Sequence, residues 1–240
     1  MLSPLTRSIS IVVTAHTEGM LLSSTLKSIE NSIVQLLNVE DCSINTVIIL
    51  DNSDLETSSI ANEYMASSIS PTQIYNVQFS DLAKSRNFAV ESTGSDWITF
   101  IDGDDLMGAD WLKSLTSTEI EFDKKSIYHP SYLVFFGKSR RIHYQNLFDK
   151  ISFEELLKII VLYNPWGSPL FAFRNLLLEN RFQETDHLYN LGFEDWTFNR
   201  MTLIKQIRHL TIPNTFYFVR DREDSLSKHK NLNHYFPSWP

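Results

Sequence analysis

The first hundred residues alternate between short apolar runs and longer segments with helical periodicity. The apolar runs are rich in β-branched residues and occupy residues 9–14, 44–50, 73–79 and 97–101. After the first run, apolar residues recur in steps of four and three, at Leu22, Leu26, Ile29, Ile33 and Leu36. This spacing predicts a helix with one apolar face. Asp54 and Asp81 stand where N-caps of two further helices would lie.

Strands that are apolar along their whole length and alternate with helices predict a parallel α/β sheet, Rossmann-like, with helices on both faces. Ligands of such sheets bind at the carboxyl ends of the strands. Polar residues follow three of the predicted strands, at His16, Glu18, Asp51, Asp102 and Asp104. The sequence therefore predicts a ligand site along one edge of the sheet.

Residues 106–240 are less regular than residues 1–105. The second half contains a predicted hairpin, 127–136 and 140–144, around Gly137-Lys138-Ser139. Further on, we expect a capped amphipathic helix over 152–162, followed by a rigid loop over 164–169 and a strand over 170–173. A second helix is expected over 194–204 and a last strand over 215–219. We interpret the halves as parts of one continuous domain, with a smaller mixed part after a boundary near residue 106.

Composition excludes several classes of protein. A net charge of −8 argues against a general nucleic-acid binder. Cys42 is the only cysteine, which excludes an intramolecular disulfide and is compatible with a reducing compartment. With no apparent secretion signal or membrane span, we expect a cytoplasmic protein. Segments 152–162 and 235–240 are candidates for peripheral contact with the inner face of the membrane, with core packing as the alternative.

Residues 96–105 form the most informative segment, because an apolar run ends in three carboxylates. Asp102 and Asp104 are two residues apart, so in extended backbone their side chains point the same way. Gly103 allows a tight turn or a close approach to a ligand. Hard oxygen ligands at this spacing suit Mg²⁺ or Mn²⁺ holding a phosphate-bearing substrate. The alternative is a polar turn in which Asp105 caps the next helix.

Glycine-rich phosphate loops are missing from the sequence. No Gly-x-Gly-x-x-Gly follows the first predicted strand. No Walker-type Gly-x-x-x-x-Gly-Lys-Ser/Thr is present either, since Gly137-Lys138-Ser139 has tyrosine, Tyr132, where the first glycine would stand. A dinucleotide-dependent oxidoreductase and a P-loop enzyme are therefore disfavoured. A metal on Asp102 and Asp104 would provide another way of holding phosphates.

Four segments together resemble the inverting family 2 glycosyltransferases of the GT-A fold. The first two are the opening strand and loop at 9–19 and a strand that ends in Asp-Asn-Ser at 48–53. The other two are a Lys-Ser-Arg-Asn helix that leads into Asp-Gly-Asp-Asp at 83–105, and Gly-Phe-Glu-Asp-Trp at 192–196. The chain departs from the family in the first loop, which commonly reads Pro-X-Tyr-Asn. Here Thr14-Ala15-His16-Thr17 takes its place, and His16 stands where a tyrosine would stack on the base.

The resemblance implies transfer of a sugar from a nucleoside-diphosphate sugar to a hydroxyl of a glycan or lipid-linked glycan, as in bacterial surface polysaccharide synthesis. The expected donor is a UDP-sugar, and the expected cofactor is Mn²⁺ or Mg²⁺. By resemblance Asp104 is the direct metal ligand, assisted by Asp102, and Asp51 accepts a hydrogen bond from the base. Asp195 is the expected general base, and Glu194 is expected to orient acceptor or sugar hydroxyls. Both acids also suit a helix N-terminus, where the dipole favours negative charge.

Further residues are expected at the two substrates. The nucleotide-sugar site is expected to include Thr14, His16, Glu18, Asp51, Asp81, Arg86, Asp102, Gly103, Arg220 and Arg222. The alternative for Arg86 is a surface ion pair with Asp81 or Glu91. The basic segment 218–230 resembles the family's C-terminal segment that closes over the donor diphosphate, with a solvated tail as the alternative. His229 within it is a weaker candidate metal ligand. Trp166 and Trp196 are expected to stack on the acceptor, with burial in the core as the alternative.

Two other classes of protein remain as alternatives. A sugar nucleotidyltransferase would usually need a glycine-rich basic loop after the first strand, where this chain has only Gly19. A non-catalytic nucleotide- or glycan-binding module is disfavoured, because carboxylates for both a metal and a general base are present. Neither the linkage nor the oligomeric state follows from the sequence.

Overall fold

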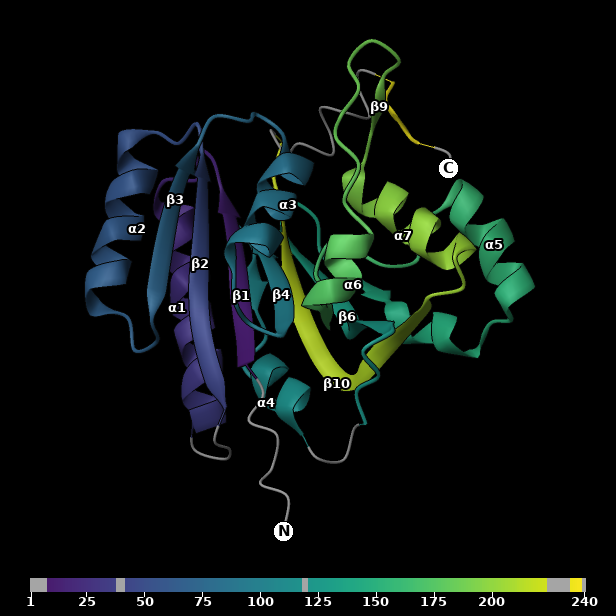
Figure 1. Ribbon diagram of the computed structural model, residues 1–240, viewed down its shortest axis with the longest axis horizontal. Coiled ribbons are helices and arrows are strands. Elements are labelled where there is room, and N and C mark those ends of the chain that lie inside the picture. Colours follow the sequence, from purple (N-terminus) through teal and green to yellow (C-terminus); the bar gives the residue numbers. More distant parts are fainter. Residues whose placement is uncertain (1–7, 38–41, 118–120, 224–233, 239–240) are drawn as a thin grey trace.

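A curved sheet of nine strands forms the centre of the protein. The computed structural model describes residues 8–37, 42–117, 121–223 and 234–238. The first four strands pair in parallel in the order β3-β2-β1-β4 (Figure 1). They are β1 (Ser8–Ala15), β2 (Ser43–Asp51), β3 (Thr72–Val77) and β4 (Trp97–Asp102). This is the predicted parallel arrangement.

Helices cover both faces of these strands (Figure 1). One face carries α1 (Met20–Leu37), α2 (Leu55–Ser67) and α4 (Trp111–Thr116), and the other carries α3 (Leu82–Ser92) and α6 (Arg174–Glu179). Along β1, Ile11 and Val13 pack in the first core, whereas Val12 packs in the second. This division follows from the alternation of side chains along a strand. Asp54 and Asp81 cap α2 and α3 as predicted.

The second half of the chain extends the same sheet. Next to β4 lies β8 (Phe171–Phe173), antiparallel to both β4 and β6 (Ser126–Gly137). The parallel neighbour of β6 is β10 (Arg208–Asp221), and the short β5 (Leu106–Met107) runs antiparallel beside β10. The predicted hairpin is formed by β6 and β7 (Arg141–Tyr144). Hydrogen bonding therefore continues across the sheet between the two halves.

A separate helical group flanks the sheet at its second half (Figure 1). It comprises the 3₁₀ helix η1 (Gln145–Lys150), α5 (Phe153–Leu162) with the predicted capping box, and α7 (Glu194–Ile204). Ile160, Trp166 and Leu203 form the core between these elements. A two-stranded sheet of β9 (Leu191–Gly192) and β11 (Phe236–Pro237) completes the fold. Among the described helices, none is long and apolar enough to cross a bilayer.

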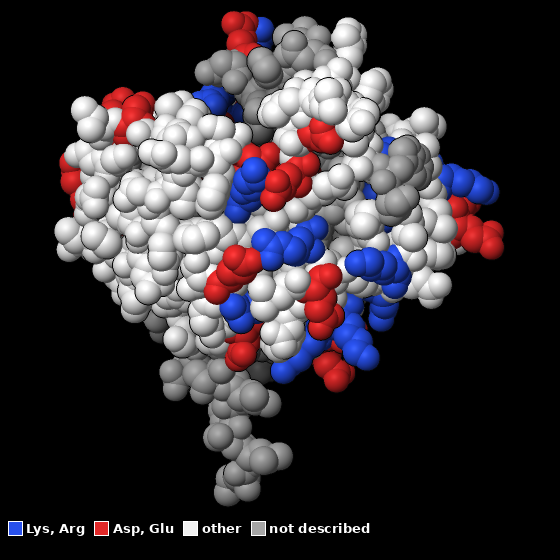
Figure 2. Space-filling view, turned by 45° about the horizontal axis from the view of Figure 1, so that its top comes forward, with Lys and Arg blue, Asp and Glu red and all other residues white. Residues whose placement is uncertain are grey.

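Charged residues are unevenly spread over the face shown in Figure 2. The left part of that view, which holds α2 and β1–β3 in Figure 1, is largely uncharged. Acidic and basic side chains are interspersed over the middle and right of the view. The described residues of this face form no broad field of positive charge of the kind that a phosphate backbone requires.

Candidate functional site

The carboxyl ends of β1 and β4 lie side by side. The acidic turn, residues 102–105, follows β4 and lies against the loop that follows β1. Thr14 is paired with Asp102 in the parallel ladder, and its Oγ1 donates to Asp102 Oδ1 at 3.2 Å. The Gly103 N–H donates to the Thr14 carbonyl at 2.8 Å. A Cβ atom at Gly103 would lie 3.0 Å from that carbonyl oxygen. The close approach of the two backbones therefore accounts for glycine at this position.

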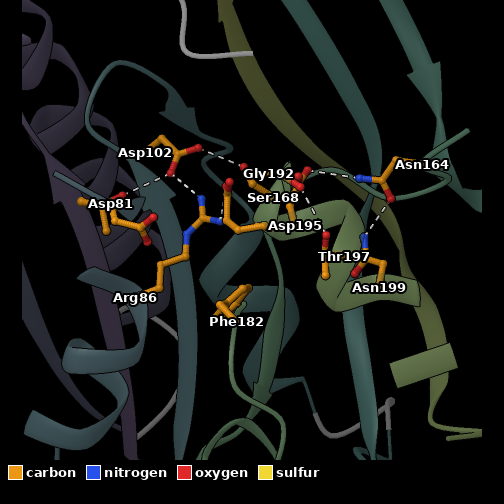
Figure 3. Close-up of polar contacts among 12 residues, drawn as sticks. Asp81, Arg86, Asp102, Asn164, Ser168, Phe182, Gly192, Asp195, Thr197 and Asn199 are labelled. Atoms are coloured by element: carbon orange, nitrogen blue, oxygen red, sulfur yellow. Dashed lines mark hydrogen bonds and ion pairs between the residues drawn. The ribbon is translucent and has the colours of Figure 1, made fainter. Parts of the chain in front are cut away.

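The Asp102 carboxylate is held by three side chains from separate parts of the chain. Oδ1 also accepts from Arg86 Nη2 at 2.7 Å, and Oδ2 accepts from Ser168 Oγ at 2.9 Å (Figure 3). The backbone N–H of Asp102 donates to the Tyr217 hydroxyl at 3.2 Å. Asp102 is consequently fixed in position and already partnered by a cation.

Arg86 lies inside the protein, and its side chain is 0% exposed. Its Nη1 donates to Glu194 Oε1 at 3.1 Å, so one guanidinium joins the acidic turn to the start of α7. Burial alone would lower the pKa of Arg86, but the charges of Asp102 and Glu194 outweigh it and raise the pKa. The ion-pair partners of Arg86 are therefore Asp102 and Glu194 and not the alternatives Asp81 and Glu91. Its expected contact with the nucleotide stays a prediction.

Asp104 and Asp105 contact the end of β10. Arg222 Nε lies 3.1 Å from Asp104 Oδ2, and Arg220 Nε donates to the Asp104 carbonyl at 2.8 Å. Burial raises the pKa of Asp104, and Arg222 opposes the rise. Asp105 does not cap a helix, because its Oδ1 accepts the Arg220 backbone N–H at 2.7 Å. Full burial, followed by the neighbouring Asp104 and Asp102, raises the pKa of Asp105 well above its ordinary value.

Asp195 lies in the first turn of α7, next to Glu194. Phe193, which precedes the helix, has a left-handed backbone with φ of 55°, a conformation that is uncommon for a bulky residue. Asn164 Nδ2 donates to Asp195 Oδ2 at 3.1 Å, and Asn164 Oδ1 accepts from Asn199 at 3.0 Å (Figure 3). The carboxylate of Asp195 is thus oriented by the loop after α5, and that loop is tied back to α7.

Asp51, which is expected to accept a hydrogen bond from the base, already accepts hydrogen bonds from several donors within the protein. Its side chain is buried and accepts from the backbone N–H groups of Phe79, Ser80 and Asp81 at 2.7, 2.9 and 3.2 Å. Ser85 Oγ and the Asn52 amide also donate to it, at 3.0 and 3.2 Å. These donors use the lone pairs of both oxygens. Asp51 therefore anchors the β3–α3 loop.

The remaining predicted nucleotide residues surround the same edge. His16 is exposed, and its backbone N–H donates to the Glu18 carboxylate. Burial raises the pKa of Glu18, and the charge of Asp104 adds to the rise. Asp81 accepts from the backbone N–H groups of Lys84 and Thr185 at 2.9 and 2.8 Å. The structure therefore brings His16, Glu18 and Asp104 to one rim, with Asp81 in the adjoining loop.

The two candidate tryptophans occupy different environments. Trp166 is 1% exposed, and the imidazoles of His129 and His209 stack on it. This burial agrees with the core alternative, although Trp166 also lines the cavity between the β6–β7 hairpin and the loop after α5. Trp196 is half-buried, donates from Nε1 to the Ile160 carbonyl at 2.7 Å and carries Arg200 over its ring. His229 lies outside the described residues.

Three polar residues were missed in the sequence. Ser168 holds Asp102, Asn164 holds Asp195, and Tyr217 accepts from the backbone of Asp102. The loop 164–169 was predicted to be rigid and to contact the acceptor through Trp166, whereas Asn164 and Ser168 are the residues that reach the carboxylates. The proline-flanked pattern could have drawn attention to Asn164 and Ser168. Tyr217 gave no local signal, since it lies inside an apolar strand.

Metal binding at the acidic turn is tested by the donor set. Among the described residues, no three acidic, histidine or cysteine side chains are arranged to hold an ion. Asp102 already accepts from three donors, whereas Asp104 is a partly exposed carboxylate at 18%. Mg²⁺ sites often use one or two carboxylates, with substrate phosphates and waters completing the shell. Asp104 fits this pattern.

The comparisons with known proteins agree with this architecture. The family model described as glycosyl transferase family 2 matches residues 10–187. The chain therefore belongs to glycosyl transferase family 2, and its fold is the GT-A fold that the sequence predicted. The Glu194–Asp195 pair lies beyond the matched span. No curated protein matches the chain.

Solved structures with the same fold include two glycosyltransferase complexes. One is TarS from S. aureus, residues 1–349, in complex with UDP-GlcNAc. It shares 17% sequence identity with this chain at a TM-score of 0.66, and the match covers 91% of this chain and 60% of that one. The mannosyltransferase PcManGT from Pyrobaculum calidifontis, with GDP-Man and Mn²⁺, is 14% identical with a TM-score of 0.60, and the match covers 90% and 58%. The chain thus spans about three fifths of each.

Proposed function

We propose that the protein transfers a sugar from a nucleoside-diphosphate sugar, with UDP as the expected nucleotide, to a hydroxyl of a glycan or lipid-linked glycan. One observation carries this proposal. The acidic turn after β4 and the Glu194–Asp195 pair of α7 are joined twice, by Arg86 and by the loop that holds Ser168 and Asn164. This double connection supports assigning donor binding to the acidic turn and the general base to the start of α7, within one site.

The chemistry assigns different tasks to the carboxylates. Transfer forms a bond from the acceptor oxygen to the anomeric carbon and breaks the bond from that carbon to the diphosphate. We assign Asp195 to take the proton of the attacking hydroxyl, because its carboxylate is half-buried and oriented by Asn164. A single displacement of this kind inverts the anomeric centre. Glu194 is bound to Arg86 and holds that guanidinium in place, which replaces its expected contact with sugar hydroxyls.

Negative charge develops on the leaving diphosphate. A bound Mn²⁺ or Mg²⁺ would stabilise that charge as a Lewis acid, and Asp104 is the residue that fits as its protein ligand. Arg220 and Arg222 reach the same turn and are suited to contact the diphosphate. Thr14, His16, Glu18 and Asp81 surround the space that we assign to the nucleotide.

The proposal is tested with Asp195→Asn, which removes the base and keeps the shape of the side chain. We expect transfer and donor hydrolysis to fall by at least about a thousandfold, while the affinity for UDP measured by calorimetry stays the same. The matched control is Glu154→Gln on the exposed surface of α5. Normal turnover by Asp195→Asn would show that another group is the base. A wild-type protein that acts on no nucleotide-sugar would disprove the proposed function.

A further inference from the structure

A cavity of about 340 Å³ lies between the β6–β7 hairpin and the loop after α5. Its walls include Phe135, Arg141, His143, Tyr163 and Asn164. This volume is in the lower range of small-molecule sites and accommodates a sugar ring with a substituent. The cavity is distinct from the nucleotide edge, since none of the residues at the acidic turn lines it.

Asn164 connects this cavity to the proposed base. It lines the cavity, and its amide donates to Asp195 Oδ2 at 3.1 Å. Under the proposed function, the attacking hydroxyl must reach Asp195. A molecule bound in the cavity would therefore lie next to the carboxylate that accepts the proton.

A fixed aromatic ring forms one wall of the cavity. His143 Nε2 lies 2.8 Å from the Pro165 carbonyl, which only accepts, so this nitrogen carries the proton. Nδ1 is then the acceptor, and the Tyr163 hydroxyl donates to it at 2.9 Å. Tyr163 is 48% exposed. The hydrogen bond therefore holds the His143 ring while part of the Tyr163 surface faces solvent. An immobilised aromatic surface suits the apolar face of a sugar.

Positive charge is provided by Arg141. Its guanidinium lies 4.1 Å from the centre of the Phe135 ring, and the residue is exposed. Within the part of the chain that the structure describes, no carboxylate lies at ion-pair distance from it. Burial and then the charge of Arg141 lower the pKa of His143, which favours a neutral imidazole. The described walls of the cavity thus carry one cation and no acid, beside a site rich in carboxylates.

We propose that this cavity binds the acceptor and that the bound sugar carries an anionic group, a carboxylate or a phosphate, held by Arg141. This inference depends on the proposed function only in identifying the bound sugar as the acceptor. A guanidinium binds either anion through paired hydrogen bonds. The same anion would be repelled from Asp102, Asp104 and Glu194, which directs it to the Arg141 end of the cavity.

The test measures binding of matched sugars by saturation-transfer NMR, with UDP present. The probes are glucose, glucuronate and glucose 6-phosphate. We expect the wild-type protein to bind at least one acidic probe about tenfold or more tightly than glucose. Arg141→Ala is expected to reduce this preference to near unity. Arg140→Ala is the matched control, because Arg140 is exposed on the same hairpin and does not line the cavity.

Two results would overturn the inference. One is a wild-type protein with no preference for either acidic probe, including the case in which no probe binds. The other is a preference that Arg141→Ala retains. Failure of the proposed function is distinguishable, because it shows as a lack of action on nucleotide-sugars while the preference for acidic sugars remains. Donor hydrolysis without that preference would leave the proposed function and remove only the anionic acceptor.

Discussion

Arg86 Nη1 lies 3.1 Å from Glu194 Oε1 inside the protein, although the two residues are 108 positions apart in the chain. The other arm of the same guanidinium reaches Asp102 at 2.7 Å. One buried cation therefore holds the end of β4 and the start of α7 at a fixed separation. The ring of Phe182, 5.5 Å from the guanidinium carbon, packs against it. The distance between the acidic turn and the proposed base depends on this contact.

Replacement of Arg86 by methionine is expected to destabilise the protein strongly. Asp102 and Glu194, whose side chains are 26% and 9% exposed, would lose their shared cation. Removing one partner of a buried pair costs about 3–5 kcal/mol. The measurement is the free energy of urea unfolding. Arg181→Met is the control, since its pair with Glu91 is exposed and is expected to cost no more than about 1 kcal/mol. Equal losses for the two variants would contradict the structural role of Arg86.

Gly103→Ala is expected to destabilise the protein by about 1–3 kcal/mol. The new Cβ atom would lie 3.0 Å from the Thr14 carbonyl oxygen and 3.1 Å from the Ala15 Cβ. Gly94→Ala is the control, because a Cβ atom at that position would meet no other atom within 4 Å. Thermal unfolding of both variants provides the comparison. A neutral Gly103→Ala would mean that β1 and β4 can separate at their ends without cost.

Much of the fold follows from local patterns. The strands from β1 to β4 and the helices between them were predictable because an apolar run or a 3.6-residue period is visible in any short window. Asp54 and Asp81 were recognisable as caps for the same reason. The place of β8, between β4 and β6, was not predictable. Its pairing depends on contacts between distant segments, which leave no periodic signal in three residues.

The candidate site was predictable as a set of segments and less so as a set of contacts. The resemblance assigned Asp102, Asp104 and Glu194 to the site, and Thr14 contacts Asp102 in the structure. It could not show that Arg86 is buried between two acids, because burial of a cation depends on what the rest of the chain places over it. Asp51 illustrates the same limit, since its backbone donors come from a loop that begins 28 residues later.

The buried histidine pair is expected to make stability depend on pH. His129 Nε2 lies 2.9 Å from His209 Nδ1. Burial lowers the pKa of His129 from 6.5 to about 3 and lowers the pKa of His209 in the same direction. At pH values between the lowered pKa and the ordinary pKa of histidine, the folded protein therefore binds fewer protons than the unfolded chain. The free energy of unfolding should fall as the pH decreases from 6.5 toward 3, by at most about 1.4 kcal/mol per pH unit for each histidine.

The measurement is the free energy of urea unfolding across that pH range, for the wild type and for His129→Phe/His209→Phe. The phenylalanines keep rings beside Trp166 and remove both titrating groups. We expect a shallower pH dependence in the double variant, even if its stability at neutral pH is lower. An identical slope would show that these two imidazoles do not titrate on unfolding.

Asn164 is expected to act as a positioning residue for Asp195. Asn164→Ala removes a hydrogen bond to a carboxylate, which is worth about 1.5–3 kcal/mol. We expect kcat to fall by about tenfold or more, with the affinity for UDP unchanged. Asn164→Asp places a negative charge beside Asp195, which raises the pKa of that carboxylate and moves the acidic limb of the pH–rate profile upward. If kcat of Asn164→Ala were normal and the acidic limb of Asn164→Asp did not move, Asn164 would have no role in positioning the base.

Asp104→Asn is expected to abolish the effect of Mn²⁺ on donor binding. We expect wild-type protein to bind UDP about tenfold or more tightly with Mn²⁺ than without it, because the ion would join the Asp104 carboxylate to the diphosphate. The amide of asparagine keeps the shape and loses the charge, so calorimetric affinities with and without Mn²⁺ should become equal. Asp110→Asn is the control, since Asp110 is exposed and its side chain makes no capping hydrogen bond. Wild-type affinities that do not change with Mn²⁺, or an Asp104→Asn variant that keeps the difference, would exclude Asp104 as the metal ligand.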